Sequence, residues 1–406
     1  MEGALSGLKV VELAHIMAGP VCGRMLADMG ADVIKVERAP GGDDSRRMVP
    51  PTVGDESAAF MMLNRNKRGA VINVKHDEGK EALRRLLGSA DVLIENYRPG
   101  TMERLGLGYE TLAEDNPGLI YCQITGFGRT GPYAMRAGFD LIAQGMSGLM
   151  SVTGEGPDRP PVKVGVPIGD ITAGILGAMG ILAAYVHRLK TGRGQRVDTS
   201  LLEASITQTY WPAAIWFATQ IDAEPMGSAH PLSAPYQSFQ TRDGWVNIGA
   251  ANQANWLRLL DVIGAEHLAQ DPRFTDNAGR RIRLAELVAE LSPLFLARTT
   301  AEWLDALESA GVPAGPVLTM GEALNDPQAR ARDMVVEVEH SRLGKVSTIG
   351  VPVKFSETPG SVRRGAPLLG EHSREVLAEI GYGEADLDRM EREGAILTPD
   401  SSTGAS

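Results

Sequence analysis

An aspartate at the start of an apolar helix, Asp170, is the first candidate for chemistry. Gly169-Asp170 stands between the apolar run Val162 to Ile168, which predicts a strand, and a glycine-spaced helical stretch. Aspartate is a favoured cap at a helix N-terminus, so a structural role is one interpretation. The same position keeps a carboxylate ionised and clear of bulky neighbours, as a carboxylate nucleophile requires. From these residues alone, capping and covalent catalysis both stay open.

A second motif, Gly126-Phe-Gly-Arg-Thr-Gly131, matches the glycine pattern of dinucleotide-binding turns. Its context differs, because Pro132 follows at once and no long apolar helix begins there. No acidic residue stands at the distance that would bind a ribose. We therefore expect a tight loop here and not a nicotinamide or flavin site.

Several further motifs share one resemblance. They are Val10-Val-Glu-Leu with Ala18-Gly-Pro20, Gly30-Ala-Asp-Val-Ile-Lys-Val-Glu-Arg38, Asn64-Arg-Asn-Lys-Arg68, Glu95-Asn-Tyr-Arg-Pro-Gly100, Gly169-Asp170 and Ala366-Pro-Leu-Leu-Gly-Glu-His372. Together they resemble family III CoA-transferases, of the formyl-CoA transferase and carnitine CoA-transferase type, over nearly the whole chain. The resemblance implies an EC 2.8.3 type enzyme that takes CoA thioesters as substrates, with no tightly bound cofactor and no metal.

By this resemblance, Asp170 is the nucleophile. It attacks an acyl-CoA thioester to give a mixed anhydride and free thiolate, and an aspartyl-CoA thioester follows. The chemistry needs an ionised carboxylate, hydrogen-bond donors for the oxyanion and exclusion of water, and the backbone near Gly169 is a candidate donor.

The resemblance also implies a set of residues that bind CoA. Arginine suits the phosphates because its guanidinium is a fork of donors, although each Arg alone could be a surface charge and His15 alone a structural histidine. The implied CoA-binding residues are His15, Met17, Ala18, Arg38, Ile72, Lys75, Asn96, Tyr97, Arg98 and Arg104.

Two departures from the family pattern bear on the substrate. Formate/oxalate members have a glutamine where this chain has Met17, and methionine cannot donate hydrogen bonds. Their four-glycine loop is missing, and the stretch His230 to Tyr236 stands in its place. The resemblance is closer to members that act on succinate, glutarate, hydroxymethylglutarate or itaconate. We expect succinyl-CoA as donor and a dicarboxylate as acceptor.

Phe139 and Asp140 separate two reaction types. In the related α-methylacyl-CoA racemases, a histidine matches Phe139 and exchanges an α-proton, which phenylalanine cannot do. A racemase-type isomerase is therefore the alternative, and a non-catalytic CoA-binding protein is a third possibility. Asp140 matches an acidic position near the family's active site, and a cap on the helix that follows it is an equal interpretation.

The elements that would position these residues alternate along the first half of the chain. Strands are expected at Leu8 to Leu13, Asp32 to Glu37, Asp91 to Glu95, Leu119 to Thr125 and Val197 to Thr199. Helices are expected at Gly19 to Met29, Glu78 to Leu87, Tyr109 to Glu114, from Asp170 to Thr191, and at Leu201 to Gln220 with a kink at Pro212. This alternation predicts an α/β fold with a doubly wound parallel sheet.

The later chain predicts a second, smaller domain. It contains a hairpin from Ser238 to Ile248 and helices at Trp256 to Ile263, Leu284 to Leu296 and Ala301 to Ala310, before strands and a C-terminal helix from Glu371 to Ile380. We expect ranges 1–220, 226–332 and 333–406, with 333–406 returning to the large domain. The resemblance implies a Rossmann-like large domain, an α+β small domain and an interlocked homodimer in which Tyr236 completes the partner's site.

Composition restricts the partners and the compartment. The net charge of −11 over 406 residues argues against nucleic-acid and anionic-membrane partners, which require clustered basic residues. The apolar run Ala173 to Val186 is too short to cross a bilayer and predicts a buried helix. The two cysteines, Cys22 and Cys122, form no disulfide or zinc spacing, and Met1 to Leu8 lacks a signal-peptide pattern. We expect a cytoplasmic protein.

Overall fold

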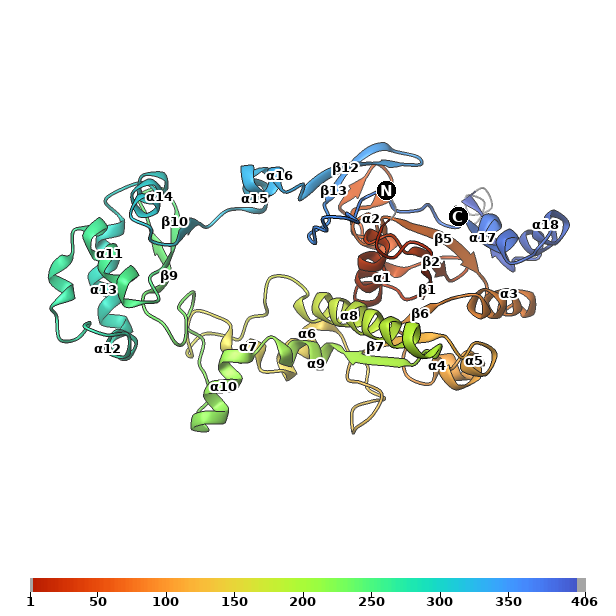
Figure 1. The fold of residues 1–406 in the computed structure, drawn as a ribbon, viewed down its shortest axis with the longest axis horizontal. Helices are drawn as coiled ribbons and strands as arrows, with labels where there is room; N and C mark the ends of the chain where they lie inside the picture. Colours follow the sequence, from red (N-terminus) through yellow and green to blue (C-terminus); the bar gives the residue numbers. More distant parts are fainter. Residues whose placement is uncertain (1–2, 400–406) are drawn as a thin grey trace. The chain divides into compact units, whose positions relative to one another are not determined.

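A seven-stranded sheet forms the centre of the fold in the computed structural model, which describes residues 3–399 (Figure 1). The strand order is β14-β5-β2-β1-β6-β7-β8, and neighbours run parallel except β14, which is antiparallel to β5. The strands are β1 (Lys9–Leu13), β2 (Asp32–Glu37), β5 (Lys67–Ile72), β6 (Val92–Glu95), β7 (Ile120–Thr125), β8 (Arg196–Ser200) and β14 (Ile396–Leu397). The predicted α/β fold with a large parallel sheet is confirmed, and the order reverses at β1, as in dinucleotide-binding sheets.

Helices cover both faces of this sheet (Figure 1). Successive side chains of a strand point to opposite faces, so Val10 packs in a core with α1 and α8 while Val11 packs in a core with α3, α5, α17 and α18. The helices of this unit are α1 (Ala18–Asp28), α2 (Ala58–Asn64), α3 (Asp77–Gly88), α4 (Thr101–Arg104), α5 (Tyr109–Asp115), α6 (Asp140–Met146), α8 (Ile168–Thr191), α9 (Leu201–Thr207), α16 (Pro327–Ala331), α17 (Ser373–Glu379) and α18 (Glu384–Arg392).

Short elements extend this first unit. They are the 3-10 turn η1 (Asp44–Arg47), the strands β3 (Thr52–Val53) and β4 (Glu56–Ser57), and the hairpin of β12 (Val335–His340) and β13 (Gly344–Ile349). The unit comprises the chain up to Ser147, Gly165–Gln208 and the chain from Pro327 onward. Segments from both ends of the sequence therefore pack together, since β14 pairs with β5 and α17 packs on the same strand.

The second unit comprises Gly148–Val164 and Thr209–Asp326. Its core is a three-stranded antiparallel sheet packed with helices around Phe239, Trp256, Phe295 and Trp303. The elements are α7 (Leu149–Val152), α10 (Tyr210–Thr219), β9 (Tyr236–Gln240), β10 (Trp245–Gly249), α11 (Gln253–Ile263), the 3-10 turn η2 (Glu266–Ala269), α12 (Asn277–Ile282), α13 (Leu284–Phe295), α14 (Thr300–Ser309), β11 (Ala314–Pro316) and α15 (Met320–Asn325). The predicted hairpin is present as β9 and β10. The ranges predicted from the sequence differ from the two units at 148–164, 209–220 and 327–332.

Three local predictions differ from the structure. The run Val162 to Ile168 forms no strand; it is irregular up to Pro167, and α8 begins at Ile168. The expected helix from Leu201 to Gln220 is two helices that meet at Gln208 and Thr209. Pro212 lies in the first turn of α10, where its missing N–H removes no intrahelical bond, so it does not kink the helix.

The long helix α8 is buried on one face only. Ala173, Ala178 and Ile181 lie in the core, whereas an apolar stripe on the other face is exposed, with Met179 60% and Leu189 68% exposed. By length and composition α8 could cross a membrane, and 44% of its apolar window is buried within the fold. Its buried half packs on α1 and β7 as a core helix does.

Candidate active site

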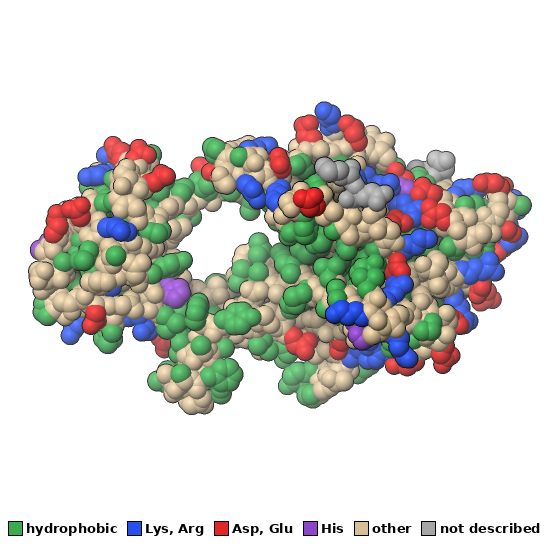
Figure 2. All heavy atoms as spheres, in the orientation of Figure 1, with side chains coloured by type: hydrophobic (Ala, Val, Ile, Leu, Met, Phe, Trp, Pro, Cys, Tyr) green, Lys and Arg blue, Asp and Glu red, His purple; other side chains and the backbone are tan. Residues whose placement is uncertain are grey.

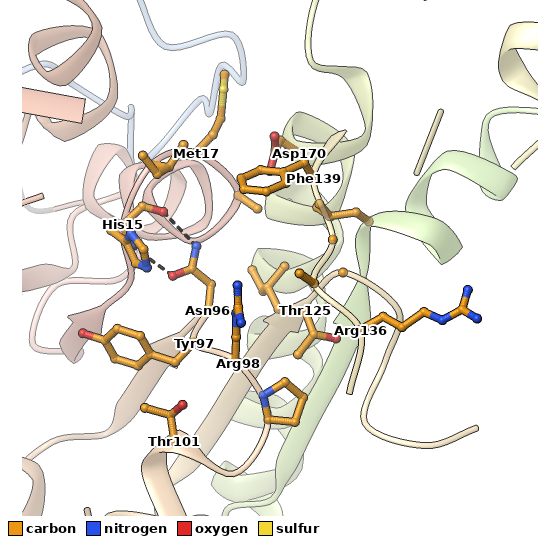
Figure 3. A pocket seen from close by; sticks show the side chains of 18 residues that line it. His15, Met17, Asn96, Tyr97, Arg98, Thr101, Thr125, Arg136, Phe139 and Asp170 are labelled. Carbon is orange, nitrogen blue, oxygen red and sulfur yellow. Dashed lines mark hydrogen bonds between the residues drawn. The ribbon is translucent and has the colours of Figure 1, made fainter. Parts of the chain in front are cut away.

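A cavity of about 370 Å³ opens where β1, β6 and β7 end, next to the reversal point of the sheet (Figure 3). In open parallel sheets, ligands bind at the carboxyl ends of the strands at such a point. The cavity is lined by His15, Ile16, Met17, Ala18, Asn96, Tyr97, Arg98, Pro99, Thr101, Ile124, Thr125, Gly126, Arg136, Ala137, Gly138, Phe139, Asp170 and Leu201. Eight of the predicted site residues therefore lie together: His15, Met17, Ala18, Asn96, Tyr97, Arg98, Phe139 and Asp170.

Asp170 lies in the first turn of α8 and its carboxyl group faces the N-terminus of α1. The pKa of Asp170 is raised to about 7. Burial is the largest cause, and the negative charge of the nearby Asp140 carboxylate is the second. A hydrogen bond from the Ala18 backbone N–H acts in the opposite direction and lowers the pKa. The carboxyl group is consequently shared between its neutral and ionised forms near pH 7, so it is both able to act as a nucleophile and sensitive to small changes around it.

Asp140 caps the helix that carries Asp170. One carboxylate oxygen, Oδ1, accepts the backbone N–H groups of Gly169 at 2.8 Å and Asp170 at 3.3 Å, and Oδ2 accepts the Gln144 amide at 2.6 Å. The sequence suggested a cap on the helix that follows Asp140, but the helix that Asp140 caps is α8. Because the Gly169 N–H is bonded to Asp140, a backbone oxyanion donor near Gly169 has to be a different N–H group.

Gly126 and Gly169 allow the chain segments around Asp140 and Asp170 to approach closely, because a side chain at either glycine would collide with its neighbours. A Cβ on Gly169 would lie 2.7 Å from Ser205 Oγ and 3.0 Å from Asp140 Oδ1. A Cβ on Gly126 would lie 2.7 Å from the Cα of Gly138. The Gly126–Gly131 stretch is an irregular loop after β7, as predicted. Its close contact with Gly138 places Phe139 and Asp140 at the cavity.

His15 is fixed by Asn96 at the end of β6. The His15 backbone N–H donates to Asn96 Oδ1 at 3.0 Å, and Asn96 Nδ2 donates to the His15 carbonyl at 2.8 Å (Figure 3). The imidazole lies against Tyr97 with ring centroids 5.7 Å apart. Burial lowers the pKa of His15 below its ordinary value, with Asp43 and Asp44 opposing the change. At neutral pH the ring is uncharged and offers one donor and one acceptor.

Apolar groups surround the carboxyl group of Asp170. Figure 3 shows the Phe139 ring beside the Asp170 carboxyl group, with Met17 at the same end of the cavity. Phe139 is 72% exposed, so its ring faces open space as well. Neither side chain can donate a hydrogen bond or exchange a proton. These two side chains make this end of the cavity apolar, and the Asp140 carboxylate is the charged group that acts on Asp170 there.

Four other residues that we predicted to bind CoA do not line this cavity: Arg38, Ile72, Lys75 and Arg104. Arg38 donates to the Gly42 carbonyl at 3.2 Å and pairs with Asp44, beside a small recess that it shares with His15 and Tyr97. Ile72 is buried in the core behind α3, and Lys75 is exposed after β5. Arg104, on α4, is exposed and donates to Thr101.

Tyr236 lies in the second unit, and its ring meets His230 edge-on with centroids 5.1 Å apart.

The sequence did not single out Ile16, Thr101, Thr125 or Arg136, which also line the cavity. Thr125 ends β7 at the carboxyl edge of the sheet, and that position was a usable signal. The guanidinium of Arg136 extends away from the other labelled side chains (Figure 3). Within residues 3–399, no group of three or more His, Cys, Asp or Glu side chains is placed to hold a metal ion.

Comparison with known proteins decides which family this site belongs to. Residues 5–373 match CoA-transferase family III. The chain belongs to CoA-transferase family III. The predicted family and enzyme class, a CoA-transferase of EC 2.8.3 type, are thereby confirmed, and CoA thioesters are the substrates of this class.

Named relatives and a solved structure cover nearly all of this CoA-transferase. The succinate–glutarate CoA-transferase of Agrobacterium fabrum is 41% identical over 382 residues, which span 93% of this chain and 95% of the relative. The acetyl-CoA:oxalate CoA-transferase of Acetobacter aceti is 40% identical, over 95% of this chain and 97% of the relative. The crystal structure of a CAIB/BAIF family protein from Brucella suis aligns with a TM-score of 0.84 and 41% identity, over 94% of this chain and 100% of that one.

Proposed function

We propose that this CoA-transferase moves CoA from succinyl-CoA to a dicarboxylate through covalent intermediates on Asp170. The observation that carries the proposal is a carboxyl group with a pKa of about 7 at the apolar end of a cavity built by the CoA-site motifs. A carboxylate that is partly desolvated, yet oriented by a backbone N–H, is poised to attack a thioester carbonyl.

The proposed reaction has four acyl transfers. The Asp170 carboxylate attacks the thioester of the donor, and CoA thiolate leaves a mixed anhydride between Asp170 and the donor acid. The thiolate then attacks the Asp170 carbonyl, which releases the donor acid and forms an aspartyl-CoA thioester. The acceptor carboxylate displaces the thiolate to form a second anhydride, and thiolate attack on the acceptor's acyl carbon gives the new acyl-CoA and restores Asp170. No redox or metal step enters this sequence.

We propose that the apolar side chains next to Asp170 keep water away from the anhydride once the substrate is bound. A mixed anhydride is hydrolysed if water reaches it, and Met17 and Phe139 occupy the space next to Asp170 (Figure 3). The Ala18 N–H is bonded to the carboxylate before the reaction and lies where a donor to the developing oxyanion is needed. We propose that Ala18, in place of Gly169, supplies a backbone donor.

For CoA itself, we propose that the mouth of the cavity binds the thioester arm and that the basic residues beyond it bind the phosphates. Arg98 lines the cavity, and Arg38 borders the recess next to His15. Arg104, Lys75 and the backbone at Ile72 complete the proposed set on the same edge of the sheet. CoA is a substrate in this scheme, and no cofactor is tightly bound.

The choice of a dicarboxylate rests on the named relatives and on Met17. The relative from Agrobacterium fabrum is named for succinate and glutarate. The relative from Acetobacter aceti is named for oxalate, so the two relatives are named for dicarboxylates of different length. Formate/oxalate members have a glutamine at the position of Met17, whose side chain is apolar. We therefore propose a longer dicarboxylate, of the glutarate type.

We also propose that the protein is a cytoplasmic homodimer. Support comes from apolar side chains left on the surface: Met179 and Leu189 on α8, and Tyr210 and Phe217 on α10. No residue of α10 is buried, and hydrophobic side chains gather over it in Figure 2. Exposed apolar surface on a helix of this kind is typical of an interface. Completion of the partner's site by Tyr236 belongs to this proposal, and ultracentrifugation that gives a monomer would contradict it.

A thioester-exchange screen tests the proposed function. The purified protein is incubated with succinyl-CoA or acetyl-CoA and a panel of mono- and dicarboxylates, and new acyl-CoA species are detected by mass. We expect transfer to a dicarboxylate, loss of transfer in Asp170→Ala with CoA binding retained, and an acyl group trapped on Asp170 by hydroxylamine. Wild-type turnover in Asp170→Ala would refute the mechanism. Deuterium entering the α-position of an acyl-CoA without acceptor acid would support the racemase alternative instead.

A further inference from the structure

Four charged side chains are fully buried beneath the loop that joins β1 to α1. Glu12, Lys35 and Lys67 are 0% exposed and Asp43 is 3% exposed. Lys35 Nζ lies 3.1 Å from Glu12 Oε1 and 2.8 Å from Asp43 Oδ2, and Lys67 Nζ lies 2.7 Å from Glu12 Oε2. We name these four residues the buried charge cluster. Removing charges from water is costly, so a cluster of this kind needs a structural or functional reason.

The cluster binds the backbone of the loop from Ala14 to Met17 and of the first turn of α1. Lys35 Nζ donates to the Ala14 carbonyl at 2.8 Å, and Lys67 Nζ donates to the Pro20 carbonyl at 2.9 Å. Between these points, Asp43 Oδ1 accepts the Ile16 N–H at 3.0 Å. Asn96 holds both backbone polar groups of His15 from the other side, as described above. The loop is thus held at successive residues by side chains from β2, β5 and β6 and from the Asp43 turn.

The loop conformation requires such support. Ile16 has a φ of 64°, in the left-handed region that β-branched residues avoid. Backbone strain of this kind persists only where the surroundings enforce it, and it is concentrated at functional sites. Ile16 lines the cavity, and two residues later Ala18 begins α1 and donates its N–H to Asp170.

Glu12 joins the cluster to α1 directly. Its carboxylate bridges the two lysines, and a Cβ on Gly23 would lie 1.9 Å from Glu12 Oε2. The absence of a side chain at residue 23 therefore lets α1 lie directly on this carboxylate. The position of α1 along its axis is fixed by Glu12 below it and by the Lys67 bond to Pro20 at its first turn.

We propose that the buried charge cluster is a positioning device: Lys35 and Asp43 hold the strained loop so that the Ala18 N–H meets the carboxylate of Asp170. The inference deepens the proposed function, on which it rests for the role of Asp170. None of the four residues touches the reacting atoms, so each acts through the loop. Charge is balanced within the cluster, with two cations against two anions.

The titration of the cluster is consistent with this role. Ion pairing with Glu12 and Asp43 raises the pKa of Lys35 despite its burial, and Lys35 keeps the pKa of Asp43 well below its ordinary range. Burial lowers the pKa of Lys67 to about 8, with Glu12 and Asp43 opposing and Lys35 adding to that change. Lys35 and Asp43 therefore stay charged at pH 7, and Lys67 is the first of the three shifted groups to lose its charge as pH rises.

Asp43→Ala and Asp43→Asn form the central test. The alanine removes the acceptor of the Ile16 N–H, whereas the asparagine keeps an oxygen in that place. The readout is the titration of Asp170 by carboxyl ¹³C NMR, with its resonance assigned by its loss in Asp170→Asn; this measurement needs no turnover, so it stands even if exchange is not found. We expect the Asp170 midpoint to rise by about one pH unit in Asp43→Ala and to return in Asp43→Asn.

Kinetics add a second readout if exchange is found. A rise of about one pH unit lowers the ionised fraction of Asp170 at pH 7 about fivefold, so kcat falls about fivefold at pH 7 and recovers at pH 9. Arg65→Met is the matched control, because Arg65 and Asp28 form an equally buried ion pair at the other end of α1. An unchanged Asp170 midpoint in folded Asp43→Ala overturns the proposal. So does failure of both Asp43 variants to fold while Arg65→Met folds, since the cluster would then serve stability alone.

Discussion

Replacing Asp140 by asparagine should make Asp170 more acidic. Asp140 raises the pKa of Asp170 through its negative charge, second to burial, and that pKa stands at about 7. Asparagine keeps an oxygen to accept the Gly169 and Asp170 N–H groups, which Asp140 Oδ1 now accepts at 2.8 and 3.3 Å, so the cap of α8 is retained while the charge is lost. Since the smaller of the two causes is removed, we expect the midpoint to fall by about one pH unit.

The change is largest on the acid side of the profile. At pH 6 the ionised fraction of Asp170 rises from about one tenth to about one half, and at pH 8 it changes by roughly a tenth. The assay is the initial rate of thioester exchange with saturating acyl-CoA from pH 5.5 to 8.5. Asp140→Asn should exchange about fivefold faster than the wild type at pH 6 and at an equal rate at pH 8.

Asp140→Ala serves as the control, because it removes both the charge and the cap. It should lose activity at every pH as the first turn of α8 loosens. A profile of Asp140→Asn that coincides with that of the wild type, with α8 intact by circular dichroism, would refute the electrostatic reasoning.

Two further predictions concern stability and packing. The folded chain raises the pKa of Asp170 from 3.8 to about 7, so the folded state binds the proton more tightly than the unfolded state, and the free energy of unfolding falls as pH rises from about 4 to 7. Asp170→Asn should therefore stabilise the protein by on the order of 4 kcal/mol at pH 8 and leave its stability unchanged at pH 3.5, as measured by calorimetry. Equal effects at both pH values would contradict this. In Gly174→Ala the new Cβ would lie 2.7 Å from the Ala18 carbonyl oxygen and 2.7 Å from Val21 Cγ1, so α1 must move away from α8. We expect the free energy of unfolding to fall by about 1–3 kcal/mol and exchange to become slower, whereas Gly88→Ala, whose Cβ meets nothing within 4 Å, should keep both its stability and its activity. A fully active, stable Gly174→Ala would show that the two helices tolerate the shift.

The strands of the sheet could be predicted where they are apolar, and two were missed: β5, which begins with charged residues, and the two-residue β14. Val10 and Val11 are both buried, on opposite faces, as a doubly covered strand requires. Strand β5 begins with Lys67 and Arg68, so its sequence does not show the apolar pattern that predicts a buried strand. Arg68 is nevertheless buried, since it pairs with Asp32 at 2.6 Å and with Glu379 at 2.6 Å. One of these partners lies 311 residues away in sequence, so no local pattern reveals the pairing.

Site residues could be predicted where a sequence motif contains them. The remaining features of the site depend on contacts between segments that are distant in sequence. His15 and Asn96 follow the adjacent strands β1 and β6, and Asp170, from a separate motif at the start of α8, lines the same cavity. The bond from Asp140 to the Gly169 N–H spans 29 residues and changed the expected source of the oxyanion donor from Gly169 to Ala18. The buried charges at Lys35 and Lys67 could only be interpreted once their loop contacts were known.

Transfer of an oxygen atom to Asp170 tests the central claim most directly. In the proposed reaction, the acceptor carboxylate attacks the aspartyl-CoA thioester, and thiolate then cleaves the second anhydride at the acceptor's acyl carbon. One oxygen of the acceptor therefore remains on Asp170 after each turnover. With an acceptor acid labelled by ¹⁸O, the peptide that contains Asp170 should gain about 2 Da per oxygen, as measured by mass spectrometry. Active exchange with the label found on another carboxylate, or on none, would contradict the assignment of Asp170 as the nucleophile.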